Sequence, residues 1–169
     1  MDSTGEVRLA GPDGAPRAAR SAAFDEVYAA ERPAIVRLAA LLVGSHAEGE
    51  ELAHDAFMKL LERLDEVDNP AGFLRTVVVR LALSTQRRRR TEARVVRRVG
   101  VDRPTSIPEL DETWDALQRL QPARRAVLVL RYYEHLHHGE IADLLGCPTA
   151  TVRSRTRRAL QDLHKELTR

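Results

Sequence analysis

The chain has 169 residues, of which 43% are hydrophobic, 31% charged and only 4% aromatic, and its net charge is +2. This composition allows a packed core of mainly Leu, Val and Ala, which favours helices, and the length suffices for one ordinary domain or two small ones. The single cysteine, Cys147, excludes an internal disulfide and a metal site built from several thiolates. The sequence contains neither an apolar run long enough to span a bilayer nor the apolar core of a secretory signal, so we expect a cytoplasmic protein without membrane contact.

The first half of the chain is expected to contain one helical domain. Residues 1–21 are rich in Gly, Ala and Pro without an apolar period, which predicts a disordered leader. Residues 22–90 show apolar residues at helical spacing, and Pro33 is acceptable at a helix start. Ser45 followed by Glu48 has the pattern of a capping box. A third helix after Asn69-Pro70 runs into four consecutive arginines, so this segment predicts a compact helical bundle.

The second half is expected to contain a linker and a second helical domain. Residues 91–110 lose the apolar period and contain Gly and Pro, which predicts a linker. Residues 111–169 return to helical spacing with a break at Pro122, and we expect an apolar stripe near the C-terminus to pack on this domain: Leu160, Leu163 and Leu167. No strand pattern competes, so the predicted fold class is all-α with two small helical domains.

Residues 141–155 have the pattern of a DNA-binding helix-turn-helix. Ala142 is small where two helices approach, Gly146 can end the first helix in left-handed geometry, and Val152 can insert between the helices. Hydroxyl and guanidinium groups on the second helix suit major-groove edges and phosphates. We therefore assign DNA contact to Thr151, Arg153, Ser154, Arg155, Arg157 and Arg158. An ordinary helical hairpin with a solvated basic face is the alternative.

The charge of the chain is unevenly distributed. Residues 24–69 contain eleven acidic and four basic residues, whereas residues 87–103 contain eight Arg and two acidic residues. Residues 147–169 contain six basic and two acidic residues. This asymmetry predicts an acidic segment and basic segments that contact different partners.

These segments together resemble the extracytoplasmic-function (ECF) sigma factors of the sigma-70 family, most closely their actinobacterial members. The acidic segment 47–57 is similar to the region-two helix that docks on the coiled coil of the large catalytic polymerase subunit. The segment 70–90 is similar to the part that opens and reads the −10 promoter element. The segment 120–134 and the helix-turn-helix are similar to region four, which reads the −35 element.

The resemblance implies an RNA polymerase sigma factor that binds core RNA polymerase and promoter DNA and directs promoter recognition, DNA opening and transcription initiation. It implies polymerase docking by an acidic face, namely Glu50, Glu51, Asp55 and Glu62. It implies contact with the −10 region by Arg80, Arg87, Arg88, Arg89 and Arg90. Many relatives are held inactive by an anti-sigma protein, which is a further candidate partner. No cofactor, metal or small-molecule substrate is expected.

The chain departs from its relatives at three places that bear on DNA contact. Many relatives carry Arg-Asn where this chain has Val79-Arg80, and an Asp near the position of Ser84. Pro148 stands where relatives often have the serine that caps the recognition helix, and we expect Thr149 to take over as the cap.

Two other interpretations stay open. The chain could be a conventional dimeric helix-turn-helix regulator that binds an operator without polymerase, or a helical adaptor whose basic face is incidental. An enzyme is not expected. His135, His137 and His138 lack a further metal ligand in register, and no nucleophile elbow, phosphate-binding glycine loop or EF-hand loop is present.

Overall fold

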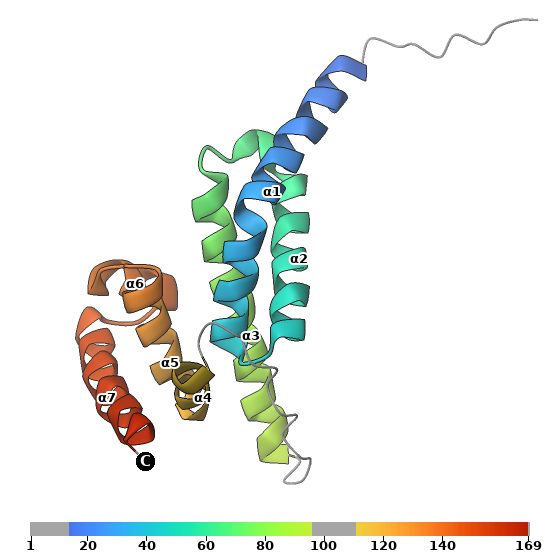
Figure 1. Cartoon of the computed structure of the whole chain (residues 1–169). Coiled ribbons are helices and arrows are strands. Elements are labelled where there is room, and N and C mark those ends of the chain that lie inside the picture. The colour runs from blue at the N-terminus through green and yellow to red at the C-terminus, as the bar shows by residue number, and fades with distance from the viewer. Residues whose placement is uncertain (1–13, 96–110, 169) are drawn as a thin grey trace, which may run out of the picture.

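The computed structural model describes residues 14–95 and 111–168, and every regular element within these ranges is helical (Figure 1). The first module contains α1 (Gly14–Val43), α2 (His46–Glu62), the 3-10 turn η1 (Leu64–Glu66) and α3 (Pro70–Val95). The second module contains α4 (Asp111–Arg119), α5 (Pro122–Leu128), the π-helical turn η2 (Val129–Tyr133), α6 (His138–Leu145) and α7 (Thr149–Leu167). The predicted all-α fold is confirmed. None of the described helices is both long and apolar enough to cross a bilayer.

The first helix begins earlier than the sequence predicts. Residues 14–21, which we assigned to a disordered leader, form the first turns of α1, and this helix of 30 residues then continues through Pro33. Alanine, the residue with the highest helix propensity, is frequent before Pro33. Arg20 anchors this part, because its guanidinium donates to the Leu61 carbonyl at 2.7 Å and lies 3.3 Å from the Asp65 carboxylate. The rest of the predicted leader, residues 1–13, lies outside the described ranges.

The core of the first module lies where α1, α2 and α3 face one another. Fully buried side chains come from all three helices: Leu38, Leu42, Phe57, Leu60, Leu74 and Val78. Each recurs at three- or four-residue spacing on its helix, as an amphipathic helix requires. α3 begins at Pro70 after Asn69, whose side-chain oxygen accepts from the Gly72 N–H at 2.9 Å. It extends to Val95, so its last turn occupies the start of the predicted linker, while residues 96–110 lie outside the described ranges.

Gly49 allows α1 and α2 to approach closely. It is buried in α2, and a Cβ at this position would lie 2.7 Å from the Ala40 backbone nitrogen and 2.9 Å from the Ala40 Cα. Backbone atoms of a packed helix cannot turn aside as the end of a flexible side chain can, so the two helices would have to separate.

We expect Gly49→Ala to lower the free energy of unfolding of the first module by about 1–3 kcal/mol, measured by chemical denaturation. Gly139→Ala is the matched control, because a Cβ at Gly139 in α6 meets no heavy atom within 4 Å. That variant should be neutral or more stable by up to about 1 kcal/mol, since alanine has the higher helix propensity. Equal stability of the two variants would contradict the close approach.

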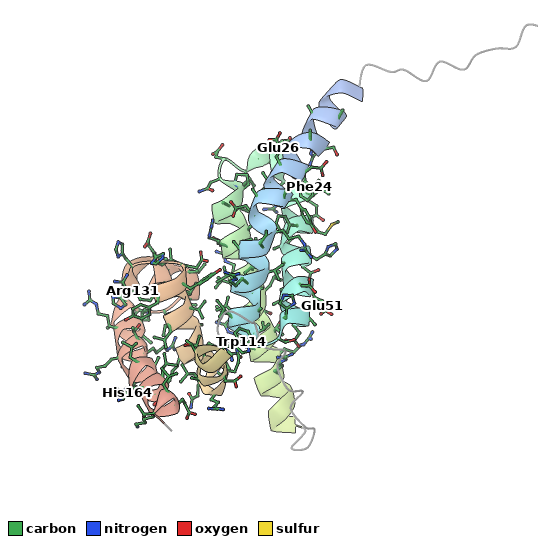
Figure 2. All side chains as sticks on the ribbon, in the orientation of Figure 1. Phe24, Glu26, Glu51, Trp114, Arg131 and His164 are labelled. Atoms are coloured by element: carbon green, nitrogen blue, oxygen red, sulfur yellow. The ribbon has the colours of Figure 1, made fainter. Side chains whose placement is uncertain are left out.

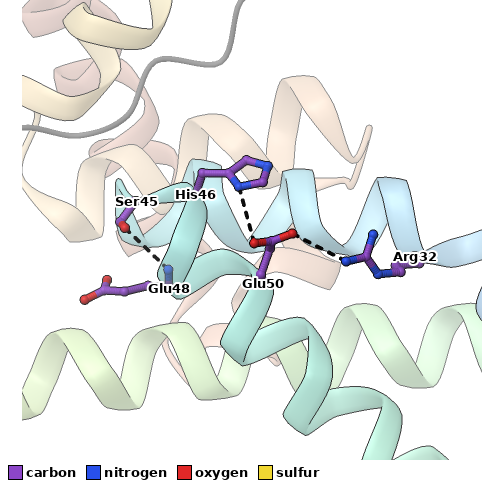
Figure 3. Close-up of polar contacts among 5 residues, drawn as sticks. All are labelled: Arg32, Ser45, His46, Glu48 and Glu50. Carbon is purple, nitrogen blue, oxygen red and sulfur yellow. Dashed lines mark hydrogen bonds and ion pairs between the residues drawn. The ribbon is translucent and has the colours of Figure 1, made fainter.

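Ser45 caps α2 as predicted, but only half of the capping box forms. The Ser45 hydroxyl accepts from the Glu48 N–H at 3.4 Å (Figure 3). The Glu48 carboxylate does not return to the cap; it forms an ion pair with Arg89 of α3. The reason is tertiary, because α3 brings a guanidinium to the N-terminus of α2.

The second module is built around Trp114 of α4, which is fully buried (Figure 2). The stripe predicted for its last helix is wrong at two of three positions, because Leu160 and Leu167 are 41% and 49% exposed. The inward side of α7 instead follows the row Val152, Thr156, Ala159 and Leu163. Leu160 follows Ala159 directly and is rotated by about 100° from that row.

The two modules lie against each other. α5 and η2 contact α1, and α6 contacts α3 (Figure 1). The sequence predicted two helical domains joined by a linker, and its local patterns contain no signal for this contact.

Candidate DNA and protein interfaces

The turn of the helix-turn-helix has the predicted geometry. Gly146 adopts left-handed backbone angles, φ 60° and ψ 44°, and the Cys147 N–H donates to the Ala142 carbonyl at 3.0 Å, which closes the end of α6. Ile141, Ala142 and Val152 are buried between α6 and its neighbours. Gly146 and the buried Val152 therefore determine the direction in which α7 leaves the turn.

The start of α7 differs from the expectation. Pro148 occupies the N-cap position without a side-chain cap bond, and Thr149 is already the first helical residue, so the expected capping by Thr149 is wrong. The Pro148 carbonyl accepts from the Thr151 and Val152 N–H groups at 2.9 and 3.2 Å. The N-terminus of α7 carries the positive end of the helix dipole, which suits a nearby phosphate.

The six predicted DNA-contact residues of α7 divide into two groups. Arg153, Arg157 and Arg158 are exposed, whereas Thr151, Ser154 and Arg155 are half-buried. Arg155 donates to the Cys147 sulfur at 3.8 Å and lines a cleft between the modules, across from Arg87 of α3. The outer arginines thus form the accessible face, and Arg155 faces the first module.

The predicted arginine cluster of α3 does not form one face. Successive residues of a helix are rotated by about 100°, so four consecutive arginines surround the axis. Arg80 and Arg87 share one exposed row with Ser84 and Thr91. Arg89 points to another side and pairs with Glu48.

Three more residues of this segment bear on the expected DNA contact: Arg88, Arg90 and Val79. Arg88 is exposed, and the side chain of Arg90 lies outside the described part of the chain. Val79, where many relatives carry Arg, is fully buried and contributes to the core. Arg80 and Arg87 therefore form an exposed basic row on this part of α3.

Three of the four carboxylates predicted to dock on polymerase form one row on α2, and Glu50 is the exception. Glu51, Asp55 and Glu62 are exposed and lie on one side of the helix, because their separations are four and seven residues. Figure 2 shows Glu51 on the side of α2 that faces away from the second module. Glu50 instead faces α1, where Arg32 lies 3.4 Å and the His46 Nδ1 3.8 Å from its carboxylate oxygens (Figure 3).

Two exposed apolar side chains at this surface, Met58 and Tyr28, are absent from the predicted site residues. Met58 is 45% exposed and lies in the same row as Glu51, Asp55 and Glu62. We call these four residues the acidic row. Tyr28 of α1 is also exposed and lines the groove between α1 and α2. The sequence did contain a signal for this apolar contact, because Met58 stands in a helix row whose other members are all charged.

One of the three histidines near α6 stands at the N-cap of that helix. The backbone N–H of His137 donates to the Glu140 carboxylate at 2.7 Å, as in a capping box at the start of α6. His135 has a positive φ of 56° in the preceding turn. In the described residues no three side chains of His, Cys, Asp or Glu converge on a point that could hold a metal ion.

Sequence comparison matches both modules to one family. The profile of sigma-70 region 2 matches residues 27–92, and that of sigma-70 region 4 matches residues 110–163. The chain belongs to the sigma-70 family. Within this sigma-70 chain, region 2 corresponds to the first module and contains the acidic row and the α3 arginines. Region 4 corresponds to the second module and contains the helix-turn-helix.

Individual relatives support the resemblance to ECF sigma factors. This sigma-70 chain is 28% identical over 156 residues to the RNA polymerase sigma-E factor of Streptomyces coelicolor, and the match covers 85% of each chain. It is 24% identical over 166 residues to the ECF RNA polymerase sigma factor SigW of Bacillus subtilis, with 86% of this chain and 89% of SigW covered. The resemblance inferred from the sequence is confirmed.

A solved structure shares the fold. The sigma factor RpoE from Bartonella quintana, crystallised with the anti-sigma factor NepR, aligns with a TM-score of 0.67 at 23% identity. The alignment covers 86% of this chain and 96% of RpoE.

Proposed function

We propose that this chain is an RNA polymerase sigma factor of the ECF type, which binds core RNA polymerase and directs promoter recognition, DNA opening and transcription initiation. The observation that supports this function best is the match of its two modules to sigma-70 regions 2 and 4. The exposed surfaces agree with it, because each module carries a basic helix and the first also carries the acidic row.

The proposed mechanism is recruitment, which requires no covalent chemistry from this chain. The carboxylates of the acidic row attract a basic helix of the polymerase and orient it, while Met58 adds an apolar contact at the centre. Arg80 and Arg87 neutralise phosphates near the −10 element, and the exposed arginines of α7 contact phosphates and base edges at the −35 element.

We assign core RNA polymerase and promoter DNA as the partners of this chain and the cytoplasm as its location, because the template and the polymerase of a bacterium are there. An anti-sigma protein is a further proposed partner, since many ECF sigma factors have one. The solved relative RpoE was crystallised with one.

The function is tested by transcription in vitro with purified core polymerase and a genomic template library. We expect new transcripts with defined start sites only when the chain and the polymerase are both present. A mobility-shift experiment without polymerase distinguishes the rival hypothesis. If the chain binds duplex DNA tightly as a dimer and adds no transcripts, it is an operator-binding regulator. If it binds neither DNA nor polymerase, it is an adaptor.

Arg87→Gln should reduce the salt dependence of promoter-complex formation by the polymerase holoenzyme. Each phosphate contact releases counterions, so loss of one contact lowers the slope of log K against log salt by about 1. Arg63→Gln is the matched control, because Arg63 is also exposed but lies at the far end of α2. Equal slopes for the two variants would show that Arg87 does not contact a phosphate.

A further inference from the structure

Two ion pairs join the recognition helix α7 to the two helices that start the second module. Arg124 in the first turn of α5 pairs with Asp162 of α7. Arg119, the last residue of α4, lies 3.6 Å from the Glu166 carboxylate of α7. Asp162 and Glu166 are four residues apart, so both carboxylates lie on one side of α7. The two pairs therefore connect three helices of one module.

The two carboxylates stand at unfavourable places in their own helix. They are the only acidic residues of α7, and both lie in its C-terminal half, where the negative end of the helix dipole repels a carboxylate. The guanidinium groups offset this repulsion. The side chains of Arg124 and Asp162 are only 28% and 30% exposed, so salt screens this pair less than one on the open surface. These acidic residues thus favour α7 only where α4 and α5 hold an arginine against them.

Apolar packing alone defines the rotation of α7 about its axis weakly. The middle of its inward row consists of two small buried residues, Thr156 and Ala159. The Thr156 hydroxyl donates to the Val152 carbonyl of the same helix at 2.9 Å. Small side chains interlock less deeply with a neighbouring helix than leucine or phenylalanine. The ion pairs therefore add directional contacts that this row lacks.

The paired side of α7 lies opposite the side assigned to DNA contact. Arg153 and Asp162 are nine residues apart, which at about 100° per residue is about two and a half turns. A rotation of α7 by about 20° would move a side-chain end at a radius of about 6 Å by roughly 2 Å. Such a displacement is enough to lose a hydrogen bond with a base edge. Loss of an ion pair on one side of α7 can therefore be felt at Arg153 on the other.

We propose that the pairs Arg124–Asp162 and Arg119–Glu166 are positioning residues for base recognition. They hold α7 at the rotation in which Arg153 meets a base edge, and they do not touch DNA themselves. The role of these pairs at the −35 element rests on the sigma function proposed above, whereas the coupling between the helices does not.

Neutralising either partner of one pair separates positioning from general electrostatic attraction. Asp162→Asn makes the second module more positive and Arg124→Gln makes it less positive, so attraction to phosphates alone would strengthen DNA binding by the first variant and weaken it by the second. Positioning predicts the same change in both, namely loss of base discrimination. The measurement is the ratio of holoenzyme dissociation constants for single −35 substitutions and for a parent promoter found by the transcription experiment above. We expect the largest ratio to fall about fivefold or more in both variants.

Asp115→Asn is the matched control, because it removes one carboxylate at an exposed position of α4. It should keep the ratio of the parent chain. Arg124→Lys should also keep most of it, since the contact with Asp162 uses one guanidinium nitrogen and lysine retains the charge. The double exchange of Arg124→Asp with Asp162→Arg rebuilds the pair in reverse and agrees with both helix dipoles. It should recover the discrimination that each single reversal loses.

Trp114 reports whether each variant keeps its fold, because this single tryptophan of the chain is buried in α4. We expect its fluorescence emission to be unchanged in the two neutralised variants. If they fold and keep the ratio of the parent, or change affinity in opposite directions at a constant ratio, the positioning role is overturned. If Arg124→Gln does not fold, Asp162→Asn and the double exchange decide.

The free chain separates this inference from the proposed function. In thermal unfolding, the double variant Arg124→Gln/Asp162→Asn should lose less Tm than the sum of the two single variants, because both changes break the same pair. Additive losses would overturn the coupling. If no holoenzyme forms, the ratio is measured with the chain alone on duplex DNA; lost discrimination there means that the sigma function is wrong and the positioning role stands. If the holoenzyme forms and folded variants discriminate normally, the sigma function stands and the positioning role is wrong.

Discussion

Asp55→Arg should weaken binding to core RNA polymerase by about 2–3 kcal/mol, or roughly thirtyfold to more than a hundredfold. Asp55 lies in the middle of the acidic row, exposed between Glu51 and Met58. Reversal of its charge replaces attraction to a basic partner helix by repulsion, and close charge pairs at protein interfaces have coupling energies of this size or larger. The measurement is the dissociation constant for fluorescently labelled chain and core polymerase.

Glu26→Arg provides the control for that measurement, since it makes the same change of charge at an exposed position of α1 outside the acidic row. Its affinity should stay within about twofold of the parent chain, because an exposed charge away from the interface is screened by salt. Comparable losses in both variants would mean that net charge, and not the acidic row, determines polymerase binding.

Arg153→Ala should weaken holoenzyme binding to promoters with an intact −35 element by about 1–3 kcal/mol if its guanidinium makes a bidentate contact with guanine. Transcription from these promoters should fall accordingly. Arg153 is exposed in the second turn of α7, where side chains of a recognition helix reach base edges. The measurement is holoenzyme binding and transcription over a set of −35 substitutions. A base contact predicts that the variant loses discrimination at one position of the element.

Lys165→Ala is the control on the same helix, because Lys165 is exposed near the other end of α7, about three turns away. It should leave both affinity and base preference unchanged. An equal weakening of all promoter sequences by Arg153→Ala would assign Arg153 to a phosphate, since phosphate contacts carry no sequence information.

Local patterns determined most elements of this protein. Gly146 and Val152 predicted the helix-turn-helix correctly, because a left-handed helix end and an inserted apolar residue depend on neighbours within a few residues. Ser45 predicted the start of α2 for the same reason. The family resemblance also came from residues close together along the chain, and the matches to both sigma-70 regions confirm it.

Interactions between distant residues decided the rest. Glu48 pairs with Arg89 rather than completing its own cap, and Leu160 stays exposed because the core of α7 follows another row. The contact of Arg125 with Leu42 and that of Arg75 with Glu134 join helices from different modules. A helix period shows which side of a helix is apolar, but the partner of a charged group depends on how helices are placed in space. The sequence alone therefore determined the helices and the family, and the tertiary structure decided which charges pair within the chain and which stay available to a partner.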